Sequence, residues 1–164
     1  MRVLIYIIIG LICMLFESSL SSHISLDLFK PDFGIPLIIY VTFFMGPRAG
    51  FITTICLGFI QEGLSSAPTG SIMFVKISLF LITTFMKKQL YIDSKYSFAL
   101  TCSAAVLLES FLFLSLSLLA RGETNNMYNI LFYAIPNAIF TGFVSIFIYS
   151  LIEYLNASYL DRVK

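Results

Sequence analysis

Residues 31–64 read PDFGIPLIIYVTFFMGPRAGFITTICLGFIQEGL, which is two apolar runs separated by Gly46, Pro47 and Arg48. Read as one continuous helix, this stretch would place Arg48 and a helix-breaking Gly-Pro pair in the middle of an apolar rod. In hydrocarbon the arginine alone would cost about 3 kcal/mol. Read as a hairpin, the same stretch places Arg48 at the surface between two short helices. The sequence therefore predicts a hairpin.

The composition of the whole chain predicts a lipid environment. Of the 164 residues, 59% are hydrophobic and only 12% are charged, with a mean hydropathy of +0.94. Soluble domains carry about 25% charged residues, so this chain has too few polar side chains to cover a water-exposed surface. Only helices and closed barrels satisfy their backbone in lipid. We expect one all-α membrane domain over residues 1–164, with spans at about 3–20, 32–45, 49–64, 71–86, 98–120 and 128–155.

The distribution of basic residues favours a cytoplasmic location for both termini. Six spans with an inner amino terminus assign seven basic residues to the cytoplasm and two, Lys30 and Arg121, to the outside, in accord with the positive-inside rule. A five-span alternative with an outer amino terminus assigns six basic residues to the cytoplasm and two to the outside, so the count alone does not exclude it. The burial of Arg48 in that alternative is what disfavours it. The first segment also imitates a cleaved signal peptide that ends in the small-x-small triplet Ser19-Leu20-Ser21, although Glu17 fits poorly before that triplet.

Lys76 and Glu109 are the two ionisable residues that fall in the membrane interior of the predicted spans, away from the span ends. Charges in hydrocarbon are costly unless they are paired or neutralised. On antiparallel neighbouring helices, both residues would lie about 16 Å deep, which permits an ion pair. Side chains lean toward the amino end of their own helix, however, and this sends Lys76 outward, where Glu62 is an alternative partner while Glu109 stays protonated. A structural pair is the favoured reading, ahead of a proton pathway.

The remaining polar residues give no catalytic motif. Glu17, Asp32 and Glu62 fall at outer span ends, where they could meet and bind a cation or simply be solvated. There is no nucleophile elbow, phosphate-binding glycine loop or metal-ligand cluster, and His23 stands alone. The net charge of +1 gives no footprint for nucleic acid. We expect no enzyme, metal or cofactor.

Small residues predict two helix-packing faces. Gly50 and Gly58 are eight residues apart and can share one face of the third span. In the last span Pro136 is followed by Asn137, whose side-chain amide would lie within the membrane. Small residues follow at near-helical spacing, namely Thr141, Gly142 and Ser145. Each face could pack against the chain itself or receive the transmembrane helix of a partner.

A pattern over about 40 residues resembles the rod shape-determining protein MreD family. It comprises a Pro-Asp start to the second helix, a glycine-rich turn, a second run with Gly58, an outer acid and a Pro-x-Gly segment. The matching residues are Pro31, Asp32, Gly46, Pro47, Arg48, Gly50, Gly58, Glu62, Pro68 and Gly70. Glu62 stands where the family usually has aspartate, which is a conservative departure.

The resemblance implies a multi-pass protein of the bacterial inner membrane that helps maintain rod shape and lateral peptidoglycan synthesis. Its implied partners are the transmembrane helix of the bitopic protein MreC, indirectly MreB and the cell-wall synthases, and membrane lipid, with a homodimer left open. We expect a scaffold in which a groove of small residues receives the MreC helix. The family's six-helix architecture is similar to that of the substrate-binding components of energy-coupling-factor transporters. A vitamin-binding component is therefore the alternative, although the first span lacks the expected Ala-x-x-x-Ala pattern.

Overall fold

The computed structural model describes residues 2–23, 32–65, 70–89, 92–121 and 127–155. These residues form six α-helices and one π-helical turn, and they contain no β-strand, so the predicted all-α class is confirmed. The helices are α1 (Arg2–His23), α2 (Gly34–Tyr40), η1 (Val41–Met45), α3 (Pro47–Leu64), α4 (Ser71–Met86), α5 (Lys95–Arg121) and α6 (Met127–Leu155).

The chain reverses at Gly46, as the Gly-Pro-Arg tripeptide predicts. Gly46 has φ +102° and ψ 166°, a backbone conformation that residues with a Cβ rarely adopt. Pro47 then begins α3, where its missing N–H is not needed, and Arg48 is exposed beside it. From this corner α3 packs back against η1 and α2. An unbroken helix through Arg48 is therefore excluded.

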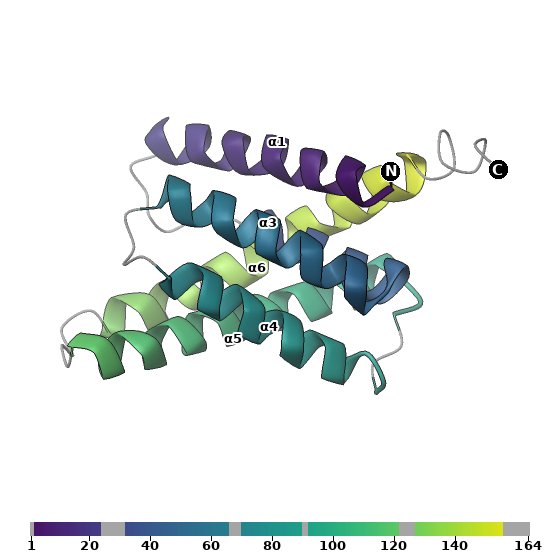
Figure 1. The fold of residues 1–164 in the computed structure, drawn as a ribbon. Helices are drawn as coiled ribbons and strands as arrows, with labels where there is room; N and C mark the ends of the chain where they lie inside the picture. Colours follow the sequence, from purple (N-terminus) through teal and green to yellow (C-terminus); the bar gives the residue numbers. More distant parts are fainter. Residues whose placement is uncertain (1, 24–31, 66–69, 90–91, 122–126, 156–164) are drawn as a thin grey trace.

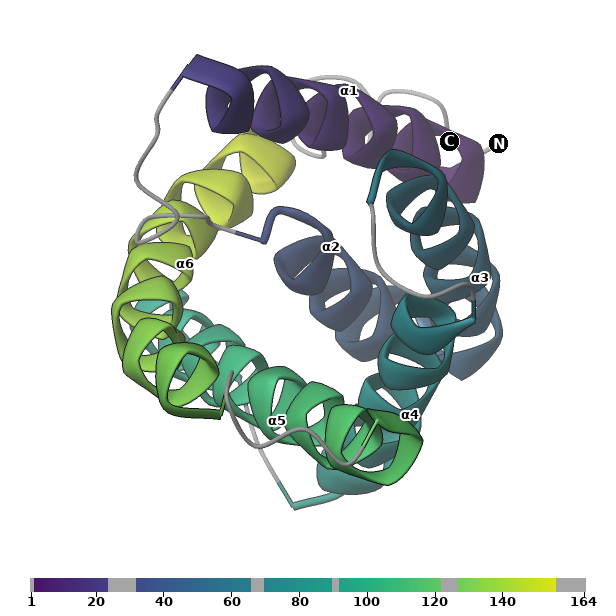
Figure 2. The same ribbon diagram turned by 90° about the vertical axis from the view of Figure 1, so that its left-hand side faces the viewer.

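The second helix is the centre of the molecule. Every residue of Gly34–Tyr40 is buried, and α2 contacts each of the other five α-helices. Figure 2 shows α2 in the middle, with α1, α3, α4, α5 and α6 arranged around it. A helix that is apolar on all sides needs such an enclosed place. Its short length therefore does not leave it exposed to solvent.

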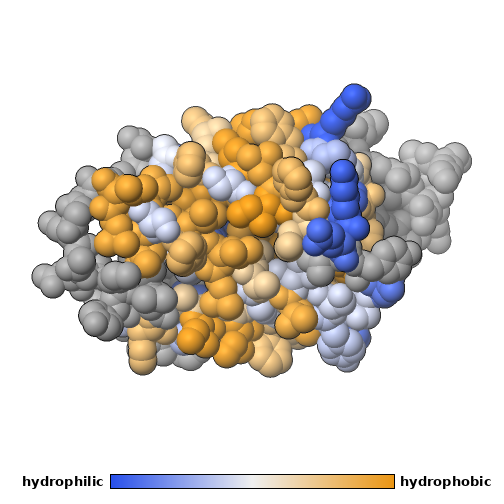
Figure 3. Space-filling view, turned by 90° about the horizontal axis from the view of Figure 1, so that it is seen from below, coloured by the Kyte–Doolittle hydropathy of each residue, from blue (hydrophilic) through white to orange (hydrophobic). Residues whose placement is uncertain are grey.

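The helices run back and forth between two ends of the bundle. The start of α1, the Gly46 corner, the connection after α4 and the end of α6 lie together at one end (Figure 1). Basic residues gather here, among them Arg48, Lys87, Lys88 and Lys95, so we call it the basic end. Figure 3 shows hydrophilic side chains gathered at this end, beside a largely hydrophobic face.

Two of the described helices are long and apolar enough to cross a membrane, over Lys95–Leu116 and Phe132–Tyr154. Three shorter apolar helices accompany them, over Leu4–Glu17, Gly34–Met45 and Ser71–Met86. Large apolar side chains also point outward, with Leu119 88% and Phe85 79% exposed. This surface is compatible with lipid as the surrounding solvent.

The small-residue faces are filled by the chain itself. A Cβ on Gly50 would overlap the Thr42 hydroxyl of η1, whereas a Cβ on Gly58 would lie 3.7 Å from the Cβ of Lys76 on α4. The two glycines thus serve two different neighbours and do not form one groove. On α6, Gly142 meets Ser103 of α5 in the same close manner. The expected groove of small residues for a partner helix is therefore occupied.

Candidate functional site

Lys76 is the centre of a buried polar cluster. It lies in the second turn of α4, and the residue is fully buried. Its Nζ is 2.5 Å from Oδ2 of Asp32 and 2.7 Å from Oε1 of Glu109 on α5. The stem of Lys76 passes Gly58 of α3, where the missing side chain leaves room for it. One buried ammonium thus bridges two carboxylates from different parts of the fold.

Asp32 makes the largest number of contacts in this cluster. Its Oδ1 accepts hydrogen bonds from the backbone N–H groups of Gly34 (2.8 Å) and Ile35 (3.2 Å), which are free at the start of α2. Its Oδ2 accepts from Nε2 of Gln61 on α3, at 3.2 Å, as well as from Lys76. A single carboxylate therefore caps the central helix and connects it to α3 and α4.

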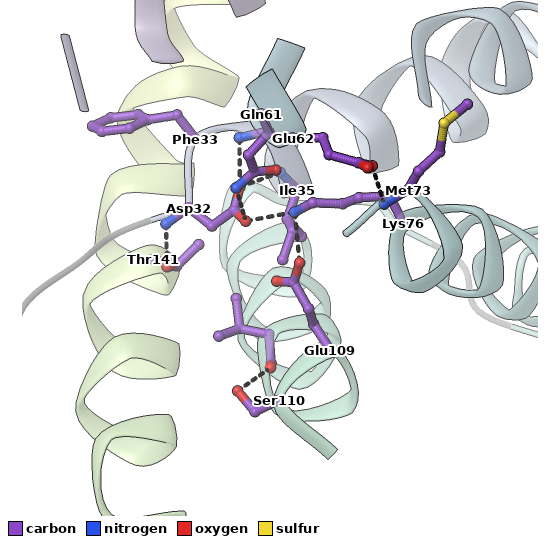
Figure 4. A network of polar contacts seen from close by, with 12 residues as sticks. Asp32, Phe33, Ile35, Gln61, Glu62, Met73, Lys76, Glu109, Ser110 and Thr141 are labelled. Atoms are coloured by element: carbon purple, nitrogen blue, oxygen red, sulfur yellow. Dashed lines mark hydrogen bonds and ion pairs between the residues drawn. The ribbon is translucent and has the colours of Figure 1, made fainter. Parts of the chain in front are cut away.

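Side chains of α1 and α6 accept hydrogen bonds from the backbone just before α2. The N–H of Asp32 donates to Oγ1 of Thr141 on α6, at 3.2 Å, and the N–H of Phe33 donates to Oε2 of Glu17 on α1, at 3.3 Å. Figure 4 shows Asp32 between Thr141, Gln61 and Lys76, with Glu109 below the ammonium end of the lysine side chain. We call this set the polar junction: Glu17, Asp32, Gln61, Lys76, Glu109 and Thr141. Side chains of α1, α3, α4, α5 and α6 thus meet around Asp32, just before the start of α2.

The electrostatics of the polar junction make its members interdependent. Lys76 has 1% side-chain exposure, and Asp32 and Glu109 have 14% and 20%, so all three charges are largely removed from water. Such charges are tolerated when they are paired and hydrogen-bonded, and removal of one partner is strongly destabilising. The buried Oε1 of Gln61 accepts no hydrogen bond from the described residues. Because Lys76 pairs with both Asp32 and Glu109, charge-assisted hydrogen bonds connect the helices at the polar junction.

Sequence reasoning found part of this site. The Lys76–Glu109 pair was one of two predicted alternatives, and the structure shows it. The other alternative is wrong, because Glu62 binds the backbone N–H groups of Gly70 and Met73 at the start of α4. Pairing of Asp32 with Lys76 was missed, although both residues stand near the start of helices that begin at the same end of the bundle.

The other predicted residues lie outside this junction or serve the fold. Gly70 has φ +90° and forms the N-cap of α4. Asn137 lies half-buried on α6, directly after Pro136. Pro31 and Pro68 lie outside the described residues. The expected outer cluster of Glu17, Asp32 and Glu62 forms only in part. Glu17 accepts from the N–H of Phe33, beside Asp32, whereas Glu62 binds the backbone at the start of α4.

The opposite end of the central helix is held by aromatic rings. Tyr40 of α2 lies 4.6 Å from Phe44, 6.2 Å from Phe98 of α5 and 5.9 Å from Tyr149 of α6, measured between ring centroids. The last two pairs meet edge to face, which is a favourable arrangement. Beside the rings, Nζ of Lys87 donates to the carbonyl oxygen of Thr42 in η1, at 3.0 Å. This end contains no buried ion pair among the described residues.

The chemistry available to the polar junction is that of binding and support. Its carboxylates accept hydrogen bonds from the lysine and from backbone N–H groups. In the part of the chain that the structure describes, no three His, Cys, Asp or Glu side chains gather where they could hold a metal ion. The arrangement defines a helical bundle with an apolar exterior and an internal polar support, which is a class typical of membrane proteins.

The family model of the rod shape-determining protein MreD matches residues 1–158 of the 164-residue chain. The chain therefore belongs to the MreD family, and a role in rod-shape determination follows from this membership. No curated protein matches the chain. No solved structure matches it either, so the expected likeness to energy-coupling-factor components has no support from these comparisons.

Proposed function

We propose that this chain is a six-span protein of the bacterial inner membrane that acts in cell elongation by binding a partner, not by catalysing a reaction. The match to the MreD family over residues 1–158 carries this proposal. The proposed partner is the single transmembrane helix of MreC, through which the chain acts indirectly on MreB and the cell-wall synthases. The vitamin-transport alternative is not favoured by the family match.

The orientation follows from the charges. The basic end carries Arg48, Lys87, Lys88 and Lys95, and it also holds the start of α1 and the end of α6. Because basic residues are enriched on the cytoplasmic side, this end is proposed to face the cytoplasm, together with both termini. The polar junction then lies toward the outer side.

The partner surface is proposed to consist of large apolar side chains. The small-residue faces of α3 and α6 are filled by the chain's own helices. Large rings remain available outside, among them Phe16 on α1 (61% exposed), Phe111 on α5 (63%) and Phe147 on α6 (77%). In lipid, where apolar surface gains little from association, packing of such side chains supplies the contact.

Affinity purification in mild detergent tests the proposal. The tagged chain, co-expressed with MreC and with an energy-coupling-factor ATPase module, is expected to recover MreC. Recovery of the ATPase module without MreC would contradict the scaffold. The matched variants Phe16→Ala, Phe111→Ala and Phe147→Ala each remove one exposed ring and leave the core intact. Loss of MreC with one of them identifies the docking helix, and size measurement of the purified chain reports a homodimer.

A further inference from the structure

A groove lies on the surface between α4 and α5, near the basic end. It has a volume of about 150 Å³. Ile82 and Met86 of α4 form one wall, Leu100, Ala104 and Leu108 of α5 form the other, and Phe43 of η1 lies between them. The groove is open to the outside, because Leu100 is 75% exposed and Met86 is 42% exposed. Its lining is almost entirely apolar.

Positive charge lies at one end of this groove. The connection 87–95 reads KKQLYIDSK, with three lysines against the single acid Asp93. Lys88 follows the groove residue Met86 by two positions, and Lys95 precedes Leu100 by just over one helical turn. Both lysines are exposed, and Nζ of Lys95 stands 5.6 Å above the ring of Tyr96. The two helices that line the groove are therefore connected, at the basic end, through a segment with two exposed lysines.

We propose that the groove binds one acyl chain of an anionic phospholipid, whose phosphate is held by Lys88 and Lys95. An apolar space of about 150 Å³ is large enough for a group of the size of benzene, which suits a stretch of acyl chain. A helix, about 10–12 Å across with its side chains, does not fit into a space of this volume. The cytoplasmic flank of a single-span partner is also basic as a rule and would be repelled here. This inference rests on the membrane placement proposed above.

Lipid titration of the purified full chain in mild detergent, followed by native mass spectrometry, tests the charge requirement. Phosphatidylglycerol is expected to bind more tightly than phosphatidylcholine. The double variant Lys88→Gln/Lys95→Gln is expected to lose roughly 30-fold in phosphatidylglycerol affinity, since each lysine near a lipid surface contributes about fivefold. The control Arg48→Gln removes a charge from the same end but from α3, and it is expected to bind nearly as the parent does. Equal binding of the two lipids would overturn the proposal.

A groove-filling variant tests the acyl-chain site separately. Ala104→Phe places a ring in the groove and is expected to abolish binding of phosphatidylglycerol. Ser150→Phe adds the same bulk at an exposed position of α6 and is expected to leave binding unchanged. MreC recovery is measured on the same variants. If Ala104→Phe abolishes MreC recovery and leaves lipid binding intact, the groove holds a partner side chain and the lipid proposal is wrong; retained MreC with lost lipid supports it.

Discussion

The central helix is held in two different ways at its two ends. At its start, Asp32 receives Lys76 at 2.5 Å together with backbone and amide donors, and every contact is directional. At its other end, Tyr40 lies among rings whose centroids are 4.6–6.2 Å away, and no single atom dominates. One end therefore depends on a few polar atoms, whereas the other depends on distributed packing.

The difference shows how a buried helix can be positioned when lipid surrounds the protein. Apolar side chains gain little by leaving lipid for a protein interior, so apolar packing alone fixes the register of α2 weakly. Buried ionic contacts can supply that register, because a misplaced charge would remain uncompensated. The polar junction is therefore expected to tolerate loss of its buried cation far less well than the aromatic end tolerates a change of shape.

The largest effect is expected from Lys76→Met. This change leaves Asp32 and Glu109 buried without their cation, and loss of one partner of a buried pair costs about 3–5 kcal/mol. The free energy of unfolding, measured by denaturant titration in detergent, should fall by this amount. Lys88→Met, at an exposed position, is the matched control.

A triple variant sharpens the test of the lysine. Lys76→Met combined with Asp32→Asn and Glu109→Gln removes all three charges and should recover part of the lost stability, since neutral replacements of buried ion pairs are often tolerated. If Lys76→Met costs no more than Lys88→Met, the polar junction does not hold the helices and the comparison fails.

A smaller loss of stability is expected from Gly50→Ala, which adds a methyl group close to the Gly46 corner. Gly50→Ala would force the new Cβ against Thr42, including its backbone Cα at 3.0 Å, and overpacking costs about 1–3 kcal/mol. Gly58→Ala is the matched control near the polar junction, where the nearest atom is 3.7 Å away and no clash arises. Thermal unfolding of both variants should rank Gly50→Ala well below Gly58→Ala. Equal melting temperatures of the two variants would show that close packing between Gly50 and Thr42 does not stabilise the aromatic end of the central helix.

The smallest effect is expected from Glu109→Gln. The amide oxygen can still accept from Lys76, and Asp32 remains as the countercharge, so the free energy of unfolding should change by no more than about 1 kcal/mol. Cells that carry this variant in place of the parent should keep their rod form. Loss of rod form at a normal protein level would show that Glu109 has a role beyond structural support.

Sequence reasoning located the helices better than it located their contacts. The Gly46 corner was predictable because backbone conformation and the cost of burying Arg48 are local properties. Asp32 as the partner of Lys76 was not predicted, because the two residues are 44 positions apart and their meeting depends on the central place of α2. Gln61 was missed for the same reason, since nothing in its local sequence indicates that it faces Asp32.

Labelling at the Gly46 corner tests whether the chain turns back here on the cytoplasmic side and crosses the membrane six times, as proposed above. In a variant without Cys13, Cys56 and Cys102, Arg48→Cys is treated with a membrane-impermeant maleimide, and Ser65→Cys serves as the counterpart at the other end of α3. Arg48→Cys is expected to react in inside-out vesicles but not in spheroplasts, and Ser65→Cys is expected to do the reverse. Reaction of Arg48→Cys in intact spheroplasts would contradict it.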